Sequence, residues 1–123
     1  MAIIVMAHLV ISIVHGRAHA GAHVPLAPAA NAFVFAVILA GPLIGLGLAW
    51  RFERVGTWII ALTMAASLIF GVVNHFVLSS PDHITHIDTP WSPLFTTTAV
   101  LLALTETLGS GLAIQSVCAR RLR

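Results

Sequence analysis

The chain has 123 residues, of which 59% are hydrophobic and 8% are charged, whereas about 25% of the residues of an average soluble domain are charged. This composition excludes an ordinary soluble domain and predicts one all-α domain, residues 1–123, embedded in a lipid bilayer as a bundle of four transmembrane helices. The formal net charge of +2 comes from six arginines and four acidic residues, which form no basic patch, so we expect no nucleic-acid partner.

Four apolar stretches are long enough to cross a bilayer, at about 20 residues per crossing. They cover approximately residues 2–20, 29–50, 56–78 and 94–117. The connections between them are short, so no part of the chain is left for a separate soluble module. The only cysteine is Cys118, which excludes an internal disulfide and a metal site built from several thiolates.

The first span carries the densest group of histidines. His8, His15, His19 and His23 follow one another at spacings of 7, 4 and 4 residues. Because an α-helix has 3.6 residues per turn, one helical face can present all four. The small residues on either side of His19 imitate a signal-peptidase site, but no basic residue precedes the apolar run. We therefore expect this span to be a retained membrane anchor.

The second span contains glycines and a proline but no ionisable residue. Gly41 and Pro42 predict a kink in its helix. The spacing of Gly41 and Gly45 predicts a close contact between helices, and we expect that contact to lie within the chain.

Polar residues return at the end of the third span and in the loop that follows it. His75 lies near the end of the span, and the loop, residues 79–93, contains Asp82, His83 and His86 but no lysine or arginine. The fourth span carries a single carboxylate, Glu106. Ionisable residues are therefore rare within the spans and frequent at one end of them.

The arginines predict the orientation of the bundle. The turn at residues 51–54 has two arginines and the tail after residue 117 has three, whereas the opposite side has only Arg17. Since basic loops stay in the cytoplasm, we expect both termini to be cytoplasmic and the histidine-rich side to face outward. In a bacterium the chain would then lie in the cytoplasmic membrane, with its histidines on the periplasmic side.

This topology gathers histidines from two spans and one loop at the outer face. Imidazole is a ligand for Zn, Fe and Cu(II), and two histidines one helical turn apart can bind the same ion. We expect a transition-metal site whose ligands are His15, His19, His75 and His86, with His83, His23 and Asp82 as further candidates. Interfacial histidines without a ligand and a metal-free proton site are the alternatives.

His8 and Glu106 lie deeper than the other candidates. At 1.5 Å per residue they are about 15 Å and 18 Å below the outer ends of their helices. An ionisable group in the hydrocarbon layer costs several kcal/mol unless it is paired, neutral or hydrated. We expect Glu106 either to pair with His8 as a buried proton relay or second site, or to be a neutral carboxyl bonded to Thr105, Thr107 or a backbone carbonyl.

Several functions are compatible with these features, and the sequence does not decide whether the chain is an enzyme. The first is a small membrane metalloprotein for redox chemistry, hydrolysis or metal capture. The second is a b-type haem electron carrier, with His15 or His8 paired with His75. The others are a non-catalytic subunit or assembly factor of a larger membrane complex, and a proton-coupled transporter built as a homo-oligomer.

The histidine spacings also carry a partial resemblance. The HxxxH pattern at residues 15–19 and the HxxH pattern at residues 83–86 resemble fragments of the motifs of membrane-bound di-iron hydroxylases and desaturases. The paired HH clusters of that family do not occur in this sequence. The chain is therefore not assigned to it.

Overall fold

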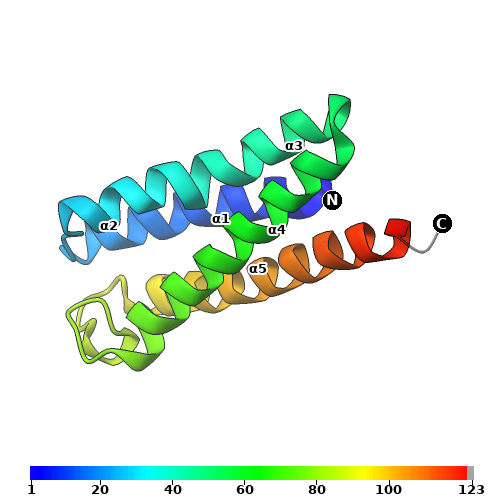
Figure 1. Ribbon diagram of the computed structural model, residues 1–123. Helices are drawn as coiled ribbons and strands as arrows, with labels where there is room; N and C mark the ends of the chain where they lie inside the picture. The colour runs from blue at the N-terminus through cyan, green and yellow to red at the C-terminus, as the bar shows by residue number, and fades with distance from the viewer. Residues whose placement is uncertain (122–123) are drawn as a thin grey trace.

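The protein is described by a computed structural model that covers residues 1–121, with side chains through residue 119 (Figure 1). Over this part of the chain the regular secondary structure is helical and includes no β-strand. The predicted all-α fold is therefore confirmed.

The helical segments of residues 1–121 are α1 (Ala2–Gly21), α2 (Pro28–Phe33), η1 (Val34–Ala40), α3 (Gly41–Arg51), α4 (Glu53–Val72), η2 (Val73–Val77), η3 (Ile84–His86) and α5 (Ser92–Arg121). Because α2, η1 and α3 are continuous, as are α4 and η2, they combine into longer rods. Within the described residues, four rods are long and apolar enough to cross a membrane: Ala2–Gly21, Pro28–Arg51, Glu53–Val77 and Ser92–Ala119. These rods match the four predicted spans to within a few residues.

The rods run alternately up and down, so the chain ends and loops separate into two groups (Figure 1). The N-terminus, the turn between α3 and α4 and the C-terminal end of α5 lie at one end of the bundle. The long loop between η2 and α5 lies at the other end. Helix α5 packs against α1 and α4, and α4 also packs against α3, whereas α1 and α3 touch at few points.

The distortion predicted in the second span takes the form of a π-helix. Pro42 has no backbone N–H, so the carbonyl of Ile38, four residues earlier, loses its usual helical partner. The turns just before Pro42, Val34–Ala40, are π-helical. A wider turn of this kind accommodates the ring and the unpaired carbonyl without ending the helix.

Glycines bring α3 and α4 together near the end that holds the termini. A Cβ atom on Gly41 would lie 2.5 Å from the Thr63 side chain, and one on Gly45 would lie 2.9 Å from the Gly56 carbonyl oxygen. Only residues without a side chain allow this approach. The predicted contact within the chain is therefore confirmed.

The outer surface of the bundle is strongly apolar. Large hydrophobic side chains are exposed on every rod, including Ile3 (85% exposed), Leu62 (63%), Ile69 (65%) and Leu108 (57%). Contiguous apolar surface of this extent is unusual for a monomer in water. It is the surface expected of a bundle surrounded by lipid chains.

Candidate metal centre

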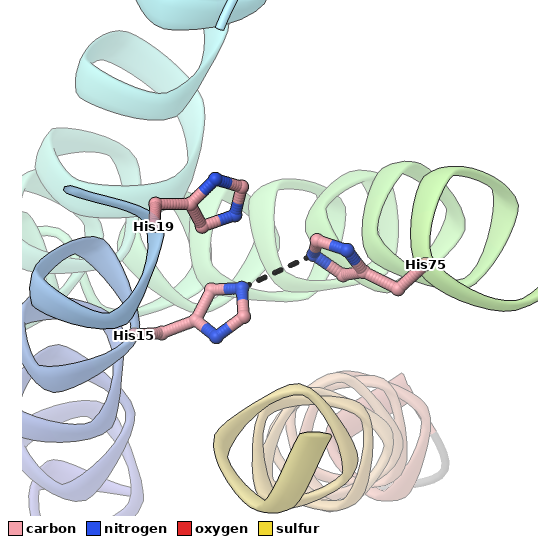
Figure 2. Close-up of side chains that lie close together, drawn as sticks. All are labelled: His15, His19 and His75. Atoms are coloured by element: carbon pink, nitrogen blue, oxygen red, sulfur yellow. Dashed lines mark hydrogen bonds between the residues drawn. The ribbon is translucent and has the colours of Figure 1, made fainter. Parts of the chain in front are cut away.

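Three histidines from two rods face one another near the end of the bundle that holds the long loop (Figure 2). His15 and His19 lie one turn apart on α1, and His75 reaches them from η2. One ring nitrogen of each lies within 4.8 Å of the others. All three residues are buried, with 6%, 8% and 6% of their surface exposed.

The Thr98 hydroxyl is the partner of His15 Nδ1. The two atoms lie 2.8 Å apart, and the same hydroxyl lies 2.7 Å from the Leu94 carbonyl oxygen. When the hydroxyl donates to Leu94, it accepts the Nδ1–H of His15, and Nε2 has the lone pair. When it donates to Nδ1, the hydrogen of the neutral His15 ring is on Nε2.

The same reasoning applies to His75 on the opposite side. Its Nδ1 lies 3.0 Å from the backbone carbonyl oxygen of Asp82 and 3.7 Å from the carboxylate oxygen Oδ1 of the same residue. Both of these groups are acceptors, so Nδ1 donates its hydrogen and Nε2 is left with a lone pair.

The two Nε2 atoms point at each other across 3.2 Å (Figure 2). This separation fits a hydrogen bond in which His15 donates its Nε2–H to His75, and it also fits two nitrogens that share one metal ion. Two nitrogens bound to one tetrahedral zinc, at 2.0–2.1 Å each, are about 3.3 Å apart. The observed separation is the one that a shared metal ion would need.

His19 and Asp82 complete the group. His19 Nε2 lies 3.4 Å from Asp82 Oδ1. Among the described residues, His19 Nδ1 and Asp82 Oδ1 are buried polar atoms without a hydrogen-bond partner. These two atoms also fit a site that is completed by an ion.

An aromatic ring from α5 supports the three imidazoles. The Phe95 ring centroid lies 4.8 Å from those of His15 and His19 and 5.3 Å from that of His75. Phe95 is fully buried and belongs to an apolar cluster with Ala18 and Ile87. This packing restricts the rotation of the histidine rings and keeps bulk water from one side of the group.

A second π-helix positions His75. The last turns of the third rod, Val73–Val77, are π-helical, and the Leu78 N–H closes them on the Val73 carbonyl oxygen at 2.8 Å. A π-helical turn rotates the residues after it relative to a regular α-helix, and such turns are frequent at functional sites. Here it places His75 opposite His15.

A cavity of about 300 Å³ extends from the histidines into the bundle. Its lining includes all three rings and Asp82 at one end and Glu106 at the other, and most of the remaining lining residues are apolar. A ligand in this cavity would reach the face of the histidine group that Phe95 does not cover.

Below the cavity, His8 pairs with Glu106. His8 Nε2 lies 3.1 Å from Glu106 Oε1, and the two residues are 1% and 3% exposed. The predicted pairing is therefore confirmed as a contact. The alternative partners Thr105 and Thr107 donate their hydroxyls to carbonyl groups of their own helix instead.

The remaining predicted ligands lie outside the group of three. His86 is exposed and its Nδ1 donates to the Ser80 carbonyl oxygen at 2.6 Å. His83 bonds the Thr85 hydroxyl at 2.8 Å, and its ring lies 5.3 Å from that of His86. His23 is exposed in the left-handed conformation that follows α1, with φ of 56°. The loop contributes Asp82 to the site in place of these histidines.

Two residues of the site were not predicted from the sequence. Phe95 and Thr98 lie one turn apart on α5, and Thr98 follows two other threonines. A phenylalanine in an apolar span and a threonine in a threonine run carry no signal of a site. Only the packing of α5 against α1 distinguishes them.

No family model matches this chain, and neither a curated protein nor a solved structure is similar enough to it to count as a match.

Proposed function

We propose that this chain is an integral membrane metalloprotein that holds one transition-metal ion between His15, His19 and His75. The observation that carries the proposal is the convergence of three buried imidazoles, two of whose Nε2 atoms lie 3.2 Å apart. A proton would satisfy this pair alone, whereas a metal ion would also use the third imidazole on the same face. Asp82 Oδ1 would then balance charge as a ligand or as a neighbour of the ligands.

The bilayer is the first partner of this protein in our proposal. The exposed apolar surface favours insertion of all four rods. The end of the bundle with residues 51–54 and the last turns of α5 carries four of the six arginines, which favours a cytoplasmic position for that end and for both termini. The histidine group would lie near the outer leaflet, on the periplasmic side of a bacterial cytoplasmic membrane.

The chemistry of the ligands favours Zn, Fe or Cu(II). Three histidine ligands leave a coordination position open, and a site with an open position is typical of catalysis rather than of structural support. The ion would supply Lewis-acid activation of an oxygen ligand, or electron transfer if it is redox-active. Asp82 is the nearest carboxylate that can accept a proton there.

The same geometry disfavours a bis-histidine haem. A haem lies between its two axial ligands, so a macrocycle would have to pass between the rings of His15 and His75. Their centroids are 4.9 Å apart, and their facing nitrogens are 3.2 Å apart. His8, the other predicted axial ligand, is engaged with Glu106.

Metal analysis of the detergent-purified protein tests the proposal. Prepared without chelators, the wild type is expected to contain about one ion per chain. The double variant His15→Ala/His19→Ala is expected to lose it. His23→Ala is the matched control, because it removes an exposed histidine just beyond the same helix and is expected to retain the ion.

Two outcomes would contradict the proposal. One is a wild type whose zinc, iron and copper together amount to less than about a tenth of an equivalent after each metal has been supplied in the growth medium. The other is equal metal content in the wild type and the double variant, which would place the ion elsewhere.

The orientation is tested with the chain's own cysteine. Cys118 is exposed on α5 near the end that we assign to the cytoplasm. A membrane-impermeant maleimide is expected to label it in inside-out vesicles but not in intact spheroplasts. The variant Cys118→Ser/His86→Cys is expected to show the opposite pattern. Labelling of Cys118 in spheroplasts would overturn the assigned topology.

A further inference from the structure

The cavity beside the histidines opens toward the surface that faces lipid. Its lining includes Ile13 on α1 and Phe35 on η1, which are 56% and 61% exposed. Helix α1 makes few contacts with η1 and α3, so the cavity reaches the outside of the bundle between these rods. A molecule that enters there comes from the bilayer and must itself be lipid-soluble.

The inner part of the cavity is apolar and partly aromatic. Its walls are formed mostly by aliphatic residues and the Phe70 ring; Asn31 also lines it, as do Ser12 and Ser67, whose hydroxyls donate to carbonyls of their own helices. The volume of about 300 Å³ lies at the lower limit of ordinary small-molecule pockets. This space suits a single ring. A longer substituent on the ring would leave between α1 and η1.

Polar groups lie at both ends of this apolar space. His75 Cδ2 and Glu106 Oε2 each lie 4.0 Å from the position that a Cβ atom on Gly71 would occupy, so they are at most about 8 Å apart. The other carboxylate oxygen of Glu106 is engaged with His8, which leaves Oε2 for a ligand. One end therefore offers the histidine group and the other a carboxylate.

We propose that this cavity binds a lipid-soluble quinone or quinol. One ring oxygen would lie at the open position of the histidine site, and the opposite oxygen would bond Glu106, while the tail extends into the bilayer. This inference rests on the proposed metal site for the first contact and on Glu106 alone for the second.

The two-ended polarity distinguishes this ligand from a single-headed amphiphile. A fatty acid or alcohol has one polar group, so its chain would leave Glu106 Oε2 facing hydrocarbon. An unsatisfied buried polar group costs about 1–3 kcal/mol. A ring with oxygens at opposite positions pairs both ends of the cavity.

The experiment uses the full chain in phosphatidylcholine nanodiscs and an azido-substituted decylubiquinone as a photoreactive probe. Labelled peptides are identified by mass spectrometry. In the wild type, the label is expected on the peptides that line the cavity, within residues 12–19, 31–39 or 67–75. Unlabelled decylubiquinone is expected to compete, and decanoic acid is not.

Glycine variants make the test specific for the cavity. Gly71→Leu places a side chain between His75 and Glu106 and is expected to reduce labelling about tenfold, equal to about 1.4 kcal/mol of binding free energy. Gly47→Leu is the matched control, because no atom lies within 4 Å of the Cβ position at Gly47 and that residue is exposed on α3. It is expected to label like the wild type.

Glu106→Leu provides a second measurement in case Gly71→Leu loses its metal or does not fold. With metal content retained, Glu106→Leu is expected to bind the probe about fivefold more weakly, because the quinone oxygen loses the carboxyl O–H that would donate to it. Labelling unchanged in both Gly71→Leu and Glu106→Leu, or equal competition by decanoic acid, would overturn the quinone proposal.

Metal content is measured in every sample, so that the two proposals fail separately. A metal-free wild type that is still labelled in the cavity would contradict the proposed metalloprotein and retain the quinone site. A metal-loaded wild type without label in the cavity would contradict the quinone site and retain the proposed metalloprotein.

Discussion

The two halves of the bundle are built from the same four rods but pack differently. In the half that holds the termini, Val5, Ile60 and Met64 form a compact apolar core, and Gly45 and Gly56 let the backbones of α3 and α4 come close. In the other half, two π-helices interrupt the α-helical rods, and a cavity of about 300 Å³ separates the buried histidines from Glu106.

This contrast indicates a division of work along the bundle. In a bundle surrounded by lipid, as we propose, helices associate by close packing and small residues, and the close backbone approach of α3 to α4 at Gly45 and Gly56 lies in the half with the termini. Polar and irregular structure is tolerated where it lines a cavity. The half with the long loop can therefore hold ionisable residues around its cavity, while the close approach of α3 to α4 supports the bundle in the other half.

The largest expected effect comes from placing the same methyl group in each half. Gly56→Ala would drive a Cβ atom into the backbone of Ala49 and Gly45 and is expected to cost about 3 kcal/mol of unfolding free energy, since neither backbone can yield easily. Gly71→Ala meets only contacts at 4.0 Å and is expected to be neutral or stabilising by up to about 1 kcal/mol. Unfolding by dodecyl sulfate in mixed micelles measures the unfolding free energy of both variants. Equal losses of unfolding free energy would contradict the difference in packing between the two halves.

The next effect concerns the pair that lies between the two halves. Glu106→Leu leaves the His8 ring, 1% exposed, without its partner and is expected to cost about 2 kcal/mol. Glu106→Gln keeps an acceptor for His8 and is expected to cost less than about 1 kcal/mol. The same unfolding measurement separates them. If both variants lose the same unfolding free energy, the stabilisation of His8 depends on the charge of Glu106 and not on its hydrogen bond.

A smaller effect is expected from the hydroxyl that orients His15. Thr98→Val removes the acceptor of the Nδ1 hydrogen and is expected to weaken metal binding about tenfold, because partners behind a metal ligand set its tautomer and orientation. Thr107→Val is the control, since Thr107 also bonds a carbonyl of α5 but is exposed. Competition with a chelator measures both affinities, and equal weakening would show that Thr98 acts only through the helix.

The smallest effect is expected at His86. Its ring is exposed and bonds the Ser80 carbonyl oxygen outside the group of three histidines, so His86→Ala is expected to change metal affinity less than about twofold. The chelator competition is again the measurement. A loss as large as that of His75→Ala would mean that the loop closes over the ion and supplies His86 as a ligand, as the sequence alone suggested.

Much of the architecture follows from the sequence because it depends on local properties. The length and hydropathy of each apolar stretch determine the four rods, and the arginines mark the end of the bundle at which both chain ends lie. The pairing of His8 with Glu106 could be anticipated from depth, since each residue adds 1.5 Å along a helix. His15 and His19 share a face because they are one turn apart.

The composition of the site was decided by tertiary structure, because it depends on how the rods rotate against one another and how the loop folds. The π-helix at Val73–Val77 turns His75 toward His15, and the residue types in that segment do not predict a π-helix. The loop presents Asp82 rather than His86, although both lie in the same polar stretch. Thr98 and Phe95 join the site only through the packing of α5 on α1. The sequence alone determined that ionisable groups gather at one end of an apolar bundle; the tertiary structure decided which of them meet, because helix rotation and loop folding arise from contacts between residues far apart in the chain.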